Sequence, residues 1–299
     1  MKILVIRHGA LGDIVLSLPA FAGIRAHHPD ATITLLTTAP FAALLAQSPW
    51  FDHVTIDTKP TPWNIPGLLA LRRALTGFDF VYDLQTSSRS SRYHRLSGAP
   101  KWSGIAPGST HRHANPARNT MHSRERIAEQ LAIAGIPNLP TPDLTWLATQ
   151  PPPGLPPRFT ALIPGASPHR PEKRWPAANF GALATTLTTQ AVILGTRAEQ
   201  PIAAEIRHLC PTAIDLTGRT TLPQLAATLA RATIAIGNDT GPMHLAAALN
   251  TRCIVLFGGA SDPALTAPRM PDGAWPTIIR ARDLADLPVS DVAAAIGDR

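Results

Sequence analysis

Short apolar runs alternate with helical patterns along this chain, and the alternation begins twice. Strands of the first half are predicted at residues 2–6, 32–37, 54–56, 80–84 and 101–105. Strands of the second half are predicted at residues 160–163, 191–194, 213–215, 233–236 and 253–257. Strands that alternate with helices are typical of βαβ units on a parallel sheet. We therefore expect an α/β fold in two similar halves.

A helical pattern follows the first predicted strand. It covers residues 14–27, and Pro19 lies inside it. Because proline has no N–H to donate, Pro19 predicts a kink or a displaced helix start. Further helices of the first half are predicted at residues 41–47, 66–75 and 124–134.

A proline-rich stretch separates the two halves. Residues 151–157 read Pro-Pro-Pro-Gly-Leu-Pro-Pro, which cannot hold regular structure and is typical of a stiff linker. The 299 residues are about twice the length of a typical domain, and a 44% hydrophobic content suffices for two cores. We expect an N-terminal domain at 1–150 and a C-terminal domain at 158–299, both of nucleotide-binding type and facing each other across a cleft.

One junction between a strand and a helix in the second half has the composition of a phosphate-binding loop. Gly237 and Gly241 allow close backbone approach, Thr240 adds a hydroxyl, and His244 lies in the first helical turn. Unpaired N–H groups and the positive end of the helix dipole attract anions at such a junction. An ordinary capped turn, with Asp239 or Thr240 as N-cap, explains the same residues.

A second candidate site follows the first predicted strand. Gly9 and Gly12 precede Asp13, and a helix is expected to begin at Ile14. Ligands of open α/β sheets bind beyond the carboxyl ends of the strands, where Asp13 would lie. An Asp at a helix start is often only an N-cap. The two glycines, however, leave room for a ligand beside the carboxylate, so we predict a catalytic role for Asp13.

The chain is basic, with a net charge of +7 and an isoelectric point near 10.2. This balance favours an acidic partner: a nucleic acid, an anionic membrane surface or a phosphorylated substrate. Residues 85–124, called here the basic segment, contain no Asp or Glu, and they predict either an anion-binding surface or a solvated face. Tyr93 and Trp102 are too few for a nucleic-acid stacking platform. The basic residues are Arg89, Arg92, Arg95, Lys101, Arg112, Arg118 and Arg124.

Several motifs, in their order and spacing, resemble glycosyltransferase family 9, the bacterial ADP-heptose:lipopolysaccharide heptosyltransferases. Each motif is weak alone, but together they span nearly the whole chain. They are Leu11-Gly12-Asp13, Asp83-Leu84-Gln85, Pro164-Gly165-Ala166-Ser167, Lys173-Arg174-Trp175-Pro176, Leu216-Thr217-Gly218-Arg219-Thr220-Thr221-Leu222, Asn238–Leu249, and Leu256-Phe257-Gly258 with Asp262-Pro263. The first loop departs from the commoner family pattern, which often carries serines where His8 and Gly9 stand.

The resemblance implies the GT-B architecture, two Rossmann-like domains facing each other across a cleft, with a last helix that can pack back on the N-terminal domain. It implies an inverting, metal-independent transfer of a sugar without a cofactor. The expected donor is ADP-heptose, and the expected acceptor is the lipopolysaccharide core or a related acidic, lipid-linked glycan. Asp13 would be the general base. The expected acceptor-binding residues are Arg89, Arg92, Arg112 and Arg118.

The donor is expected to bind the second half of the chain. The resemblance places Lys173 on the donor diphosphate, where its charge would offset that of the leaving group. Glu199 follows a predicted strand end, where a carboxylate can accept from ribose hydroxyls. A first-turn carboxylate stabilised by the helix dipole explains Glu199 equally well. The expected donor-binding residues are Ser167, Lys173, Glu199, Asp239, Thr240, Gly241 and His244.

One motif favours a different class of enzyme. Arg7-His8-Gly9 resembles the opening of histidine phosphatases, in which the His accepts the phosphoryl group. That class needs a second His, typically followed by Gly or Ala, whereas His169, His208 and His244 are followed by Arg, Leu and Leu. We therefore interpret His8 as a loop residue near the expected cleft. A nucleotide-sugar epimerase and a non-catalytic nucleotide-binding protein are further alternatives.

The compartment is inferred from cysteine content and hydropathy. Cys210 and Cys253 are too few for a disulfide framework, which favours a reducing compartment. No stretch approaches the ~20 apolar residues of a spanning helix. We expect a cytoplasmic enzyme, peripheral at the inner face of the inner membrane, that does not bind nucleic acid.

Overall fold

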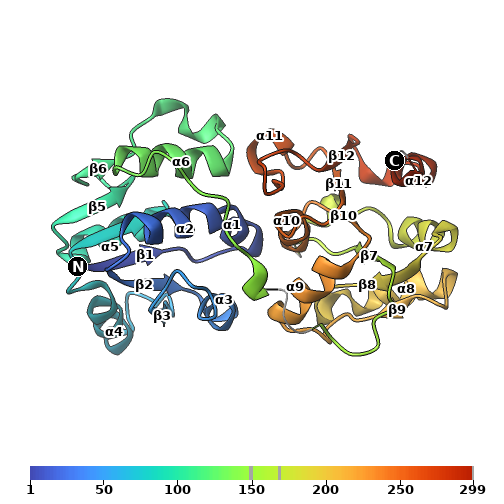
Figure 1. The fold of residues 1–299 in the computed structure, drawn as a ribbon, viewed down its shortest axis with the longest axis horizontal. Helices are drawn as coiled ribbons and strands as arrows, with labels where there is room; N and C mark the ends of the chain where they lie inside the picture. Colours follow the sequence, from blue (N-terminus) through green and yellow to red (C-terminus); the bar gives the residue numbers. More distant parts are fainter. Residues whose placement is uncertain (148–150, 168–169, 298–299) are drawn as a thin grey trace. The chain divides into compact units, whose positions relative to one another are not determined.

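The computed structural model describes residues 1–147, 151–167 and 170–297. The chain divides into two compact units, Met1–Pro142 and Asp143–Arg299 (Figure 1). The proline-rich residues 151–157 therefore belong to the second unit. Residues 148–150, at the end of the predicted N-terminal domain, and His169 lie outside the described residues.

The first unit is built on a six-stranded sheet with the strand order β3-β2-β1-β4-β5-β6, and all its strand pairs are parallel. The strands are β1 (Lys2–Ile6), β2 (Thr32–Thr37), β3 (His53–Ile56), β4 (Phe80–Asp83), β5 (Lys101–Gly104) and β6 (His111–Arg112). The helices are α1 (Leu11–Leu16), α2 (Leu18–His27), α3 (Ala39–Leu45), α4 (Ile65–Leu75), α5 (Ser88–Ser97), η1 (Pro116–Thr120) and α6 (Ser123–Ile133). Only two residues long, β6 leaves no apolar pattern in the sequence.

The second unit is also built on a six-stranded parallel sheet, with the order β12-β11-β10-β7-β8-β9. The strands are β7 (Phe159–Ile163), β8 (Gln190–Ile193), β9 (Ile214–Asp215), β10 (Ile234–Asn238), β11 (Cys253–Phe257) and β12 (Thr277–Arg280). The helices are η2 (Thr145–Leu147), η3 (Pro171–Lys173), α7 (Ala177–Thr186), η4 (Arg197–Glu199), α8 (Gln200–Leu209), α9 (Leu222–Arg231), α10 (Gly241–Ala248), α11 (Pro263–Thr266), η5 (Leu284–Asp286) and α12 (Val289–Gly297). The sequence prediction lacks β12, whose residues are only partly buried.

Both sheets have the same topology when the strands are counted from the first strand of each unit. This order is that of the doubly wound nucleotide-binding fold. The predicted α/β fold in two similar halves is confirmed. In each unit the strand order reverses beside the first strand, because β1 lies between β2 and β4, and β7 lies between β8 and β10. The loops after β1 and β4, and those after β7 and β10, therefore leave their sheets side by side, where ligands bind in this fold.

The predicted effect of Pro19 is confirmed. Instead of one helix over 14–27, the chain forms α1 and α2 with Ser17 between them, and Pro19 lies in the first positions of α2. A proline is tolerated there because the first N–H groups of a helix have no partner within it. The break ends α1 after Leu16, so Asp13 lies in a short helix directly after the β1 loop.

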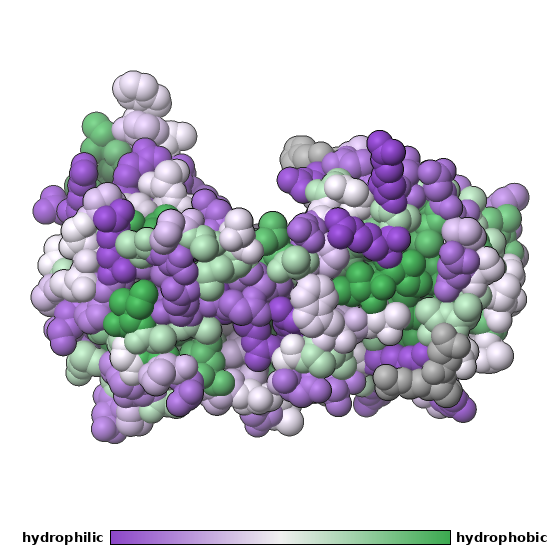
Figure 2. Space-filling model, turned by 90° about the horizontal axis from the view of Figure 1, so that it is seen from above, coloured by the Kyte–Doolittle hydropathy of each residue, from purple (hydrophilic) through white to green (hydrophobic). Residues whose placement is uncertain are grey.

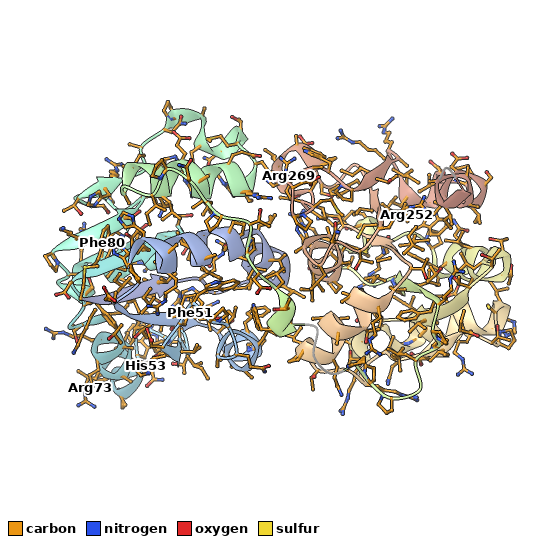
Figure 3. All side chains as sticks on the ribbon, viewed as in Figure 1. Phe51, His53, Arg73, Phe80, Arg252 and Arg269 are labelled. Atoms are coloured by element: carbon orange, nitrogen blue, oxygen red, sulfur yellow. The ribbon has the colours of Figure 1, made fainter. Side chains whose placement is uncertain are left out.

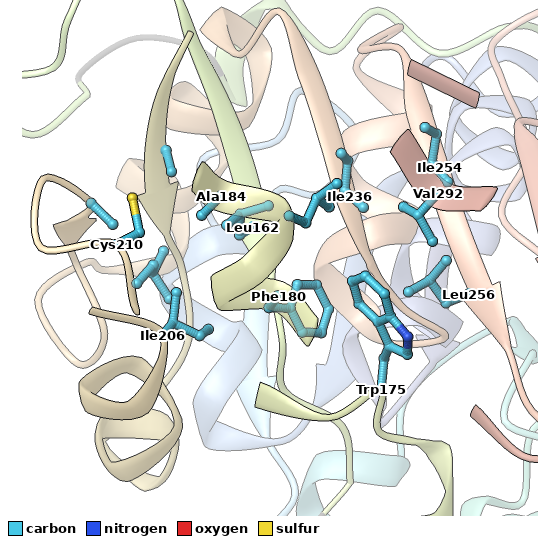
Figure 4. Close-up of a cluster of buried hydrophobic side chains, with 14 of the residues drawn as sticks. Leu162, Trp175, Phe180, Ala184, Ile206, Cys210, Ile236, Ile254, Leu256 and Val292 are labelled. Carbon is cyan, nitrogen blue, oxygen red and sulfur yellow. The ribbon is translucent and has the colours of Figure 1, made fainter. Parts of the chain in front are cut away.

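Each unit has its own apolar core. In the first unit, Leu4, Val81, Tyr93 and Trp102 are part of a buried cluster. In the second, Trp175 and Phe180 meet edge to face within a larger cluster (Figure 4). Outside these cores, the face seen in Figure 2 is mainly hydrophilic, with smaller apolar areas between.

The last helix packs on the second unit. Val292 of α12 is fully buried in the cluster that contains Trp175, and α12 contacts α7 and β11. Trp175 also donates its indole N–H to the carbonyl of Leu287, 3.0 Å away, which fixes the chain just before α12. Its apolar face therefore completes the core of its own unit. The expected packing of this helix on the N-terminal domain stays a prediction.

Candidate active site

Arg7 organises the loop that follows β1. Its guanidinium is buried and donates to the carbonyl of Leu84 after β4, at 2.7 Å, and to the carbonyl of Asp13 in α1, at 2.9 Å. Burial lowers the pKa of Arg7, and the charge of Asp13 opposes that shift. This one side chain therefore ties together both loops of the first unit at the strand-order reversal.

The carboxylate of Asp13 is held but accessible. Its Oδ1 lies 3.1 Å from Nη2 of Arg7, and its Oδ2 accepts from the backbone N–H of Ala10 at 3.1 Å. The N-cap of α1 is Ala10 rather than Asp13, which lies at the third position of the helix, so its contact with the Ala10 N–H caps α1 from within the helix. The side chain is nonetheless 45% exposed, so a ligand can reach it.

His8 faces the interior of the first unit. Its Nε2 lies 3.0 Å from Oδ2 of Asp57, and the side chain is only 2% exposed. The hydroxyl of Tyr93 donates to the same oxygen of Asp57 at 2.8 Å. Burial opposes ionisation of Asp57, but its contacts with His8 and Tyr93 prevail and hold its pKa below the ordinary value. Because the imidazole of His8 is so deeply buried, it is unsuited to accept a phosphoryl group. This argues against the histidine-phosphatase alternative.

Strand β4 ends in a buried acid. Asp83 accepts from the backbone N–H groups of Gln85 and Thr86 at 3.1 and 3.0 Å. It is fully buried, and burial raises its pKa to about 6, although these hydrogen bonds act in the opposite direction. Gln85 in turn accepts from the backbone N–H of His8 at 2.9 Å. The Asp83-Leu84-Gln85 motif therefore shapes the loops that surround Asp13.

The four predicted acceptor-binding arginines divide into two pairs. Arg118 is half-buried and donates to the hydroxyl of Thr86 beside the β4 loop. Arg89 is also half-buried and interacts with the hydroxyl of Tyr93. Arg92, on α5, and Arg112, on β6, are exposed. The structure thus brings Arg118 to the β4 loop, whereas Arg92 and Arg112 lie on the outer surface.

Arg126 is a basic residue that the motifs did not indicate. Its charge lowers the pKa values of both Arg7 and Arg118, so the three guanidinium groups lie close enough to repel one another. A cluster of guanidinium groups favours bound carboxylate or phosphate. The signal in the sequence was slight, because Arg126 lies just beyond the basic segment and next to Glu125.

In the second unit, Lys173 and Asp239 form a close ion pair. Nζ of Lys173 lies 2.7 Å from Oδ2 of Asp239, and the side chains are 14% and 7% exposed. Nε2 of His244 lies 4.0 Å from the other oxygen of Asp239. Three of the predicted donor residues thus meet where the loops after β7 and β10 leave the sheet.

Asn238 joins these two loops. Its Nδ2 donates to the carbonyl of Pro164 after β7 at 2.8 Å, and its Oδ1 accepts from the backbone N–H of Trp175 at 3.0 Å. Because Trp175 is anchored in the core, the segment that contains Lys173 is fixed relative to β10. The motif identified Asn238 as a family residue but gave no hint of this role.

Thr240 and Gly241 begin helix α10. Thr240 is the N-cap residue in an extended conformation, but its side chain makes no capping hydrogen bond. Thr240 thus occupies the N-cap position, but its side chain does not cap the helix as the capped-turn alternative requires. Asp239 pairs with Lys173 instead. The positive helix end and the lysine together favour an anion at this junction.

Glu199 is buried beside the same loops. Its Oε2 accepts from the backbone N–H and the hydroxyl of Thr196 at 2.7 and 2.6 Å, which is a capping role at η4. A Cβ on Gly165 would lie 2.9 Å from Cγ of Glu199, so the β7 loop passes Glu199 only because residue 165 is glycine. Ser167 is exposed on that loop. Ribose binding by Glu199 and diphosphate binding by Ser167 stay predictions.

The described residues also bear on metal binding and on membrane insertion. Within residues 1–147, 151–167 and 170–297, no three His, Cys, Asp or Glu side chains are grouped as a metal site would require. None of the helices described here has the length and apolar character needed to cross a bilayer.

Comparison with known proteins places these sites in a family context. The sequence model of glycosyltransferase family 9 (heptosyltransferase) matches residues 68–275. Lipooligosaccharide heptosyltransferase 2 of Haemophilus influenzae is 38% identical over 127 residues, covering 40% of this chain and 35% of that protein. Lipopolysaccharide heptosyltransferase 2 of Escherichia coli K12 is 27% identical over 307 residues, covering 90% and 85%.

A solved structure shows the fold. The E. coli heptosyltransferase WaaC, solved with ADP-2-deoxy-2-fluoro heptose, has a TM-score of 0.80 and 20% sequence identity. The match covers 100% of this chain and 99% of that one. The predicted GT-B fold class is confirmed.

Proposed function

The chain belongs to glycosyltransferase family 9, the heptosyltransferase family, and we propose that it transfers heptose from ADP-heptose, with inversion, to the lipopolysaccharide core or a related acidic glycan. The observation that carries the proposal is the exposed, arginine-paired carboxylate of Asp13 at the strand-order reversal of the first unit. Family membership decides against the phosphatase, the epimerase and the non-catalytic binding protein.

In the proposed reaction, Asp13 takes the proton of an acceptor hydroxyl while that oxygen attacks the anomeric carbon of the donor. The bond between the anomeric carbon and the diphosphate oxygen breaks in the same step, and ADP leaves with the bonding pair. A single displacement inverts the configuration at the anomeric carbon. General-base assistance contributes about 10²–10⁴-fold, so other groups must supply the rest of the rate enhancement.

The leaving diphosphate is the second place where charge develops. Lys173, the Thr240 hydroxyl and the N–H groups at the start of α10 are the groups proposed to stabilise it. The ion pair with Asp239 supports this role because it holds the lysine at the end of β10 before the donor binds. The proposed ADP-heptose donor is consistent with the ADP-sugar in the related WaaC structure.

The acceptor is proposed to bind the first unit. Arg118, Arg7 and Arg126 form a cationic group beside the loop that carries Asp13. Such a group suits the carboxylates and phosphates of an acidic glycan. Because the acceptor class is lipid-linked, we place the enzyme in the cytoplasm, peripheral at the inner face of the inner membrane.

The test is transfer by the purified chain, followed as ADP release from ADP-heptose in the presence of a lipopolysaccharide-core acceptor. Asp13→Asn should lower kcat by about 10²-fold or more and leave ADP affinity nearly unchanged. Asp52→Asn is the matched control, because Asp52 is also 45% exposed and also paired with an arginine, Arg25. Near-normal turnover by Asp13→Asn would contradict the general-base role. Absence of transfer by the unaltered chain would contradict the proposed substrates.

A further inference from the structure

Large apolar side chains are exposed along the segment formed by the β3–α4 loop and helix α4. Trp63 is 89% exposed, Ile65 is 65% exposed and Leu69 is 52% exposed. Single exposed apolar residues are ordinary on a protein surface, but a group within seven positions of the chain is not. Ile56, at the end of β3, is also exposed, at 47%. This exposed group is not explained by the core of the first unit.

The same segment is basic. Lys59, Arg72 and Arg73 are exposed, and the sequence contains no Asp or Glu between Asp57 and Asp79. Figure 3 shows Arg73 on the outer side of α4. We call Trp63, Ile65 and Leu69, together with these three basic residues, the interfacial patch.

The helix α4 has two distinct faces. Leu71 and Leu75 are buried in the cluster with Val81, Tyr93 and Trp102 and attach the helix to its sheet. Ile65, Leu69, Arg72 and Arg73 follow the spacing i, i+4, i+7 and i+8, which places them on one other stripe. This stripe combines apolar and cationic residues, as in helices that lie in the membrane interface.

The loop before α4 presents Trp63 on a fixed backbone. The carboxylate of Asp57 accepts from the N–H of Lys59 at 2.7 Å, and Asn64 caps α4 by accepting from the N–H of Gly67 at 3.0 Å. Pro60, Pro62 and Pro66 restrict the chain further. Little conformational entropy is therefore lost when this loop meets a partner.

We propose that the interfacial patch docks the enzyme on an anionic phospholipid surface. Tryptophan is favoured at the boundary between headgroups and acyl chains, and basic residues beside it are attracted to anionic headgroups. A second copy of the chain fits less well, because a symmetric contact would bring the cations of both patches together.

The patch is also placed to serve the catalytic loop. Asp57, which fixes the start of the β3–α4 loop, lies 3.0 Å from His8 in the β1 loop. The loops after β1 and β3 leave the same edge of the parallel sheet. Docking would thus bring the edge that carries Asp13 to the membrane, where a lipid-linked acceptor lies. The choice of a bilayer as partner rests on the proposed acceptor.

The test is co-sedimentation of the full chain with large unilamellar vesicles. Vesicles of equal parts phosphatidylglycerol and phosphatidylcholine should bind it, and pure phosphatidylcholine vesicles should bind it more weakly. Trp63→Ser/Leu69→Ser should weaken binding by about tenfold or more. Arg72→Gln/Arg73→Gln should weaken it by about fivefold per charge removed, and added salt should reduce the effect. Ile133→Ser/Leu209→Ser is the control, since these residues are 44% and 43% exposed elsewhere.

The outcomes separate this inference from the proposed function. Vesicle binding needs no turnover, and the patch variants should transfer to a soluble, delipidated acceptor at the unaltered rate. Equal vesicle binding by the patch variants and the control would overturn the docking surface. A dimer in solution that the Trp63 variant disrupts, without vesicle binding, would assign the patch to a second copy and also overturn it. Loss of transfer to the soluble acceptor by the patch variants would overturn the docking role too, because it would assign the patch to the transfer reaction itself.

Discussion

The ion pair between Lys173 and Asp239 allows donor binding and protein stability to be separated by two substitutions. We expect Lys173→Ala to remove one charge-assisted contact to the diphosphate, worth about 1.5–3 kcal/mol, and so to raise the Kd for ADP about 10- to 100-fold. The same substitution leaves the carboxylate of Asp239, only 7% exposed, without its cation. Breaking a buried pair in this way costs about 3 kcal/mol or more, which should lower the melting temperature.

Asp239→Asn tests whether these two effects are distinct. The amide oxygen can still accept from Lys173, while the negative charge beside the phosphate site is lost. ADP affinity should therefore change much less than in Lys173→Ala. In the double variant, no buried carboxylate is left unpaired, so the melting temperature should recover while ADP binding stays weak. This is a double-mutant cycle in which the coupling appears in stability.

Calorimetric titration with ADP and thermal unfolding are the two assays. Arg170→Ala is the matched control, because Arg170 is a cation three residues before Lys173 whose side chain donates to the carbonyl of Ala260 at 3.3 Å. Unaltered ADP affinity in Lys173→Ala would refute the donor role of the lysine. A double variant as unstable as Lys173→Ala would refute the unpaired-carboxylate explanation.

Two further predictions concern the first unit. Burial raises the pKa of Asp83 to about 6, so the folded state holds this proton more tightly than the unfolded state, and stability should fall as pH rises from about 4 through about 6. Relative to Asp83→Asn, the free energy of unfolding of the unaltered chain should fall by on the order of 3 kcal/mol over that range. Urea titrations at a series of pH values would measure this fall, and parallel pH profiles of the two proteins would contradict it. Arg118→Ala should raise the acceptor KM more than Arg112→Ala, with ADP affinity unchanged in both, because only Arg118 contacts the β4 loop. Equal acceptor KM values for these two variants would contradict the inference that Arg118 contributes more to acceptor binding than Arg112.

The sheets were largely predictable because their strands are buried on both faces and read as apolar runs. β1, β7 and β11 are examples in which nearly every residue is buried. The two-residue strand β6 and the partly buried strand β12 lack this signal. Packing of α12 was also beyond a local pattern, since it depends on Val292 joining the buried cluster that contains Trp175, which lies far away in the sequence.

The places of the proposed site residues in the fold were more predictable than the side chains that they contact. Motifs gave Asp13, Lys173 and Asp239, because loops after neighbouring parallel strands must lie at the same sheet edge. They did not give the pairing of Lys173 with Asp239, the burial of His8 against Asp57, or the charge of Arg126 beside Arg118. The first two contacts depend on side-chain packing between segments that are distant in sequence, and the third depends on how the chain folds back between η1 and α6.

The two units contain a similar ion pair, and exposure explains why we assign the two carboxylates different roles. In each unit a cation that follows the first strand, Arg7 or Lys173, pairs with an aspartate near the strand-order reversal. Asp13 is 45% exposed, so an acceptor hydroxyl can approach it and pass on a proton. Asp239 is 7% exposed and lies against Lys173, so it can orient the lysine but is poorly placed to meet a substrate hydroxyl. We therefore propose that a pair of a cation and an aspartate serves proton transfer in the first unit, where the acid is open to solvent, and positions the cation in the second unit, where the acid is buried.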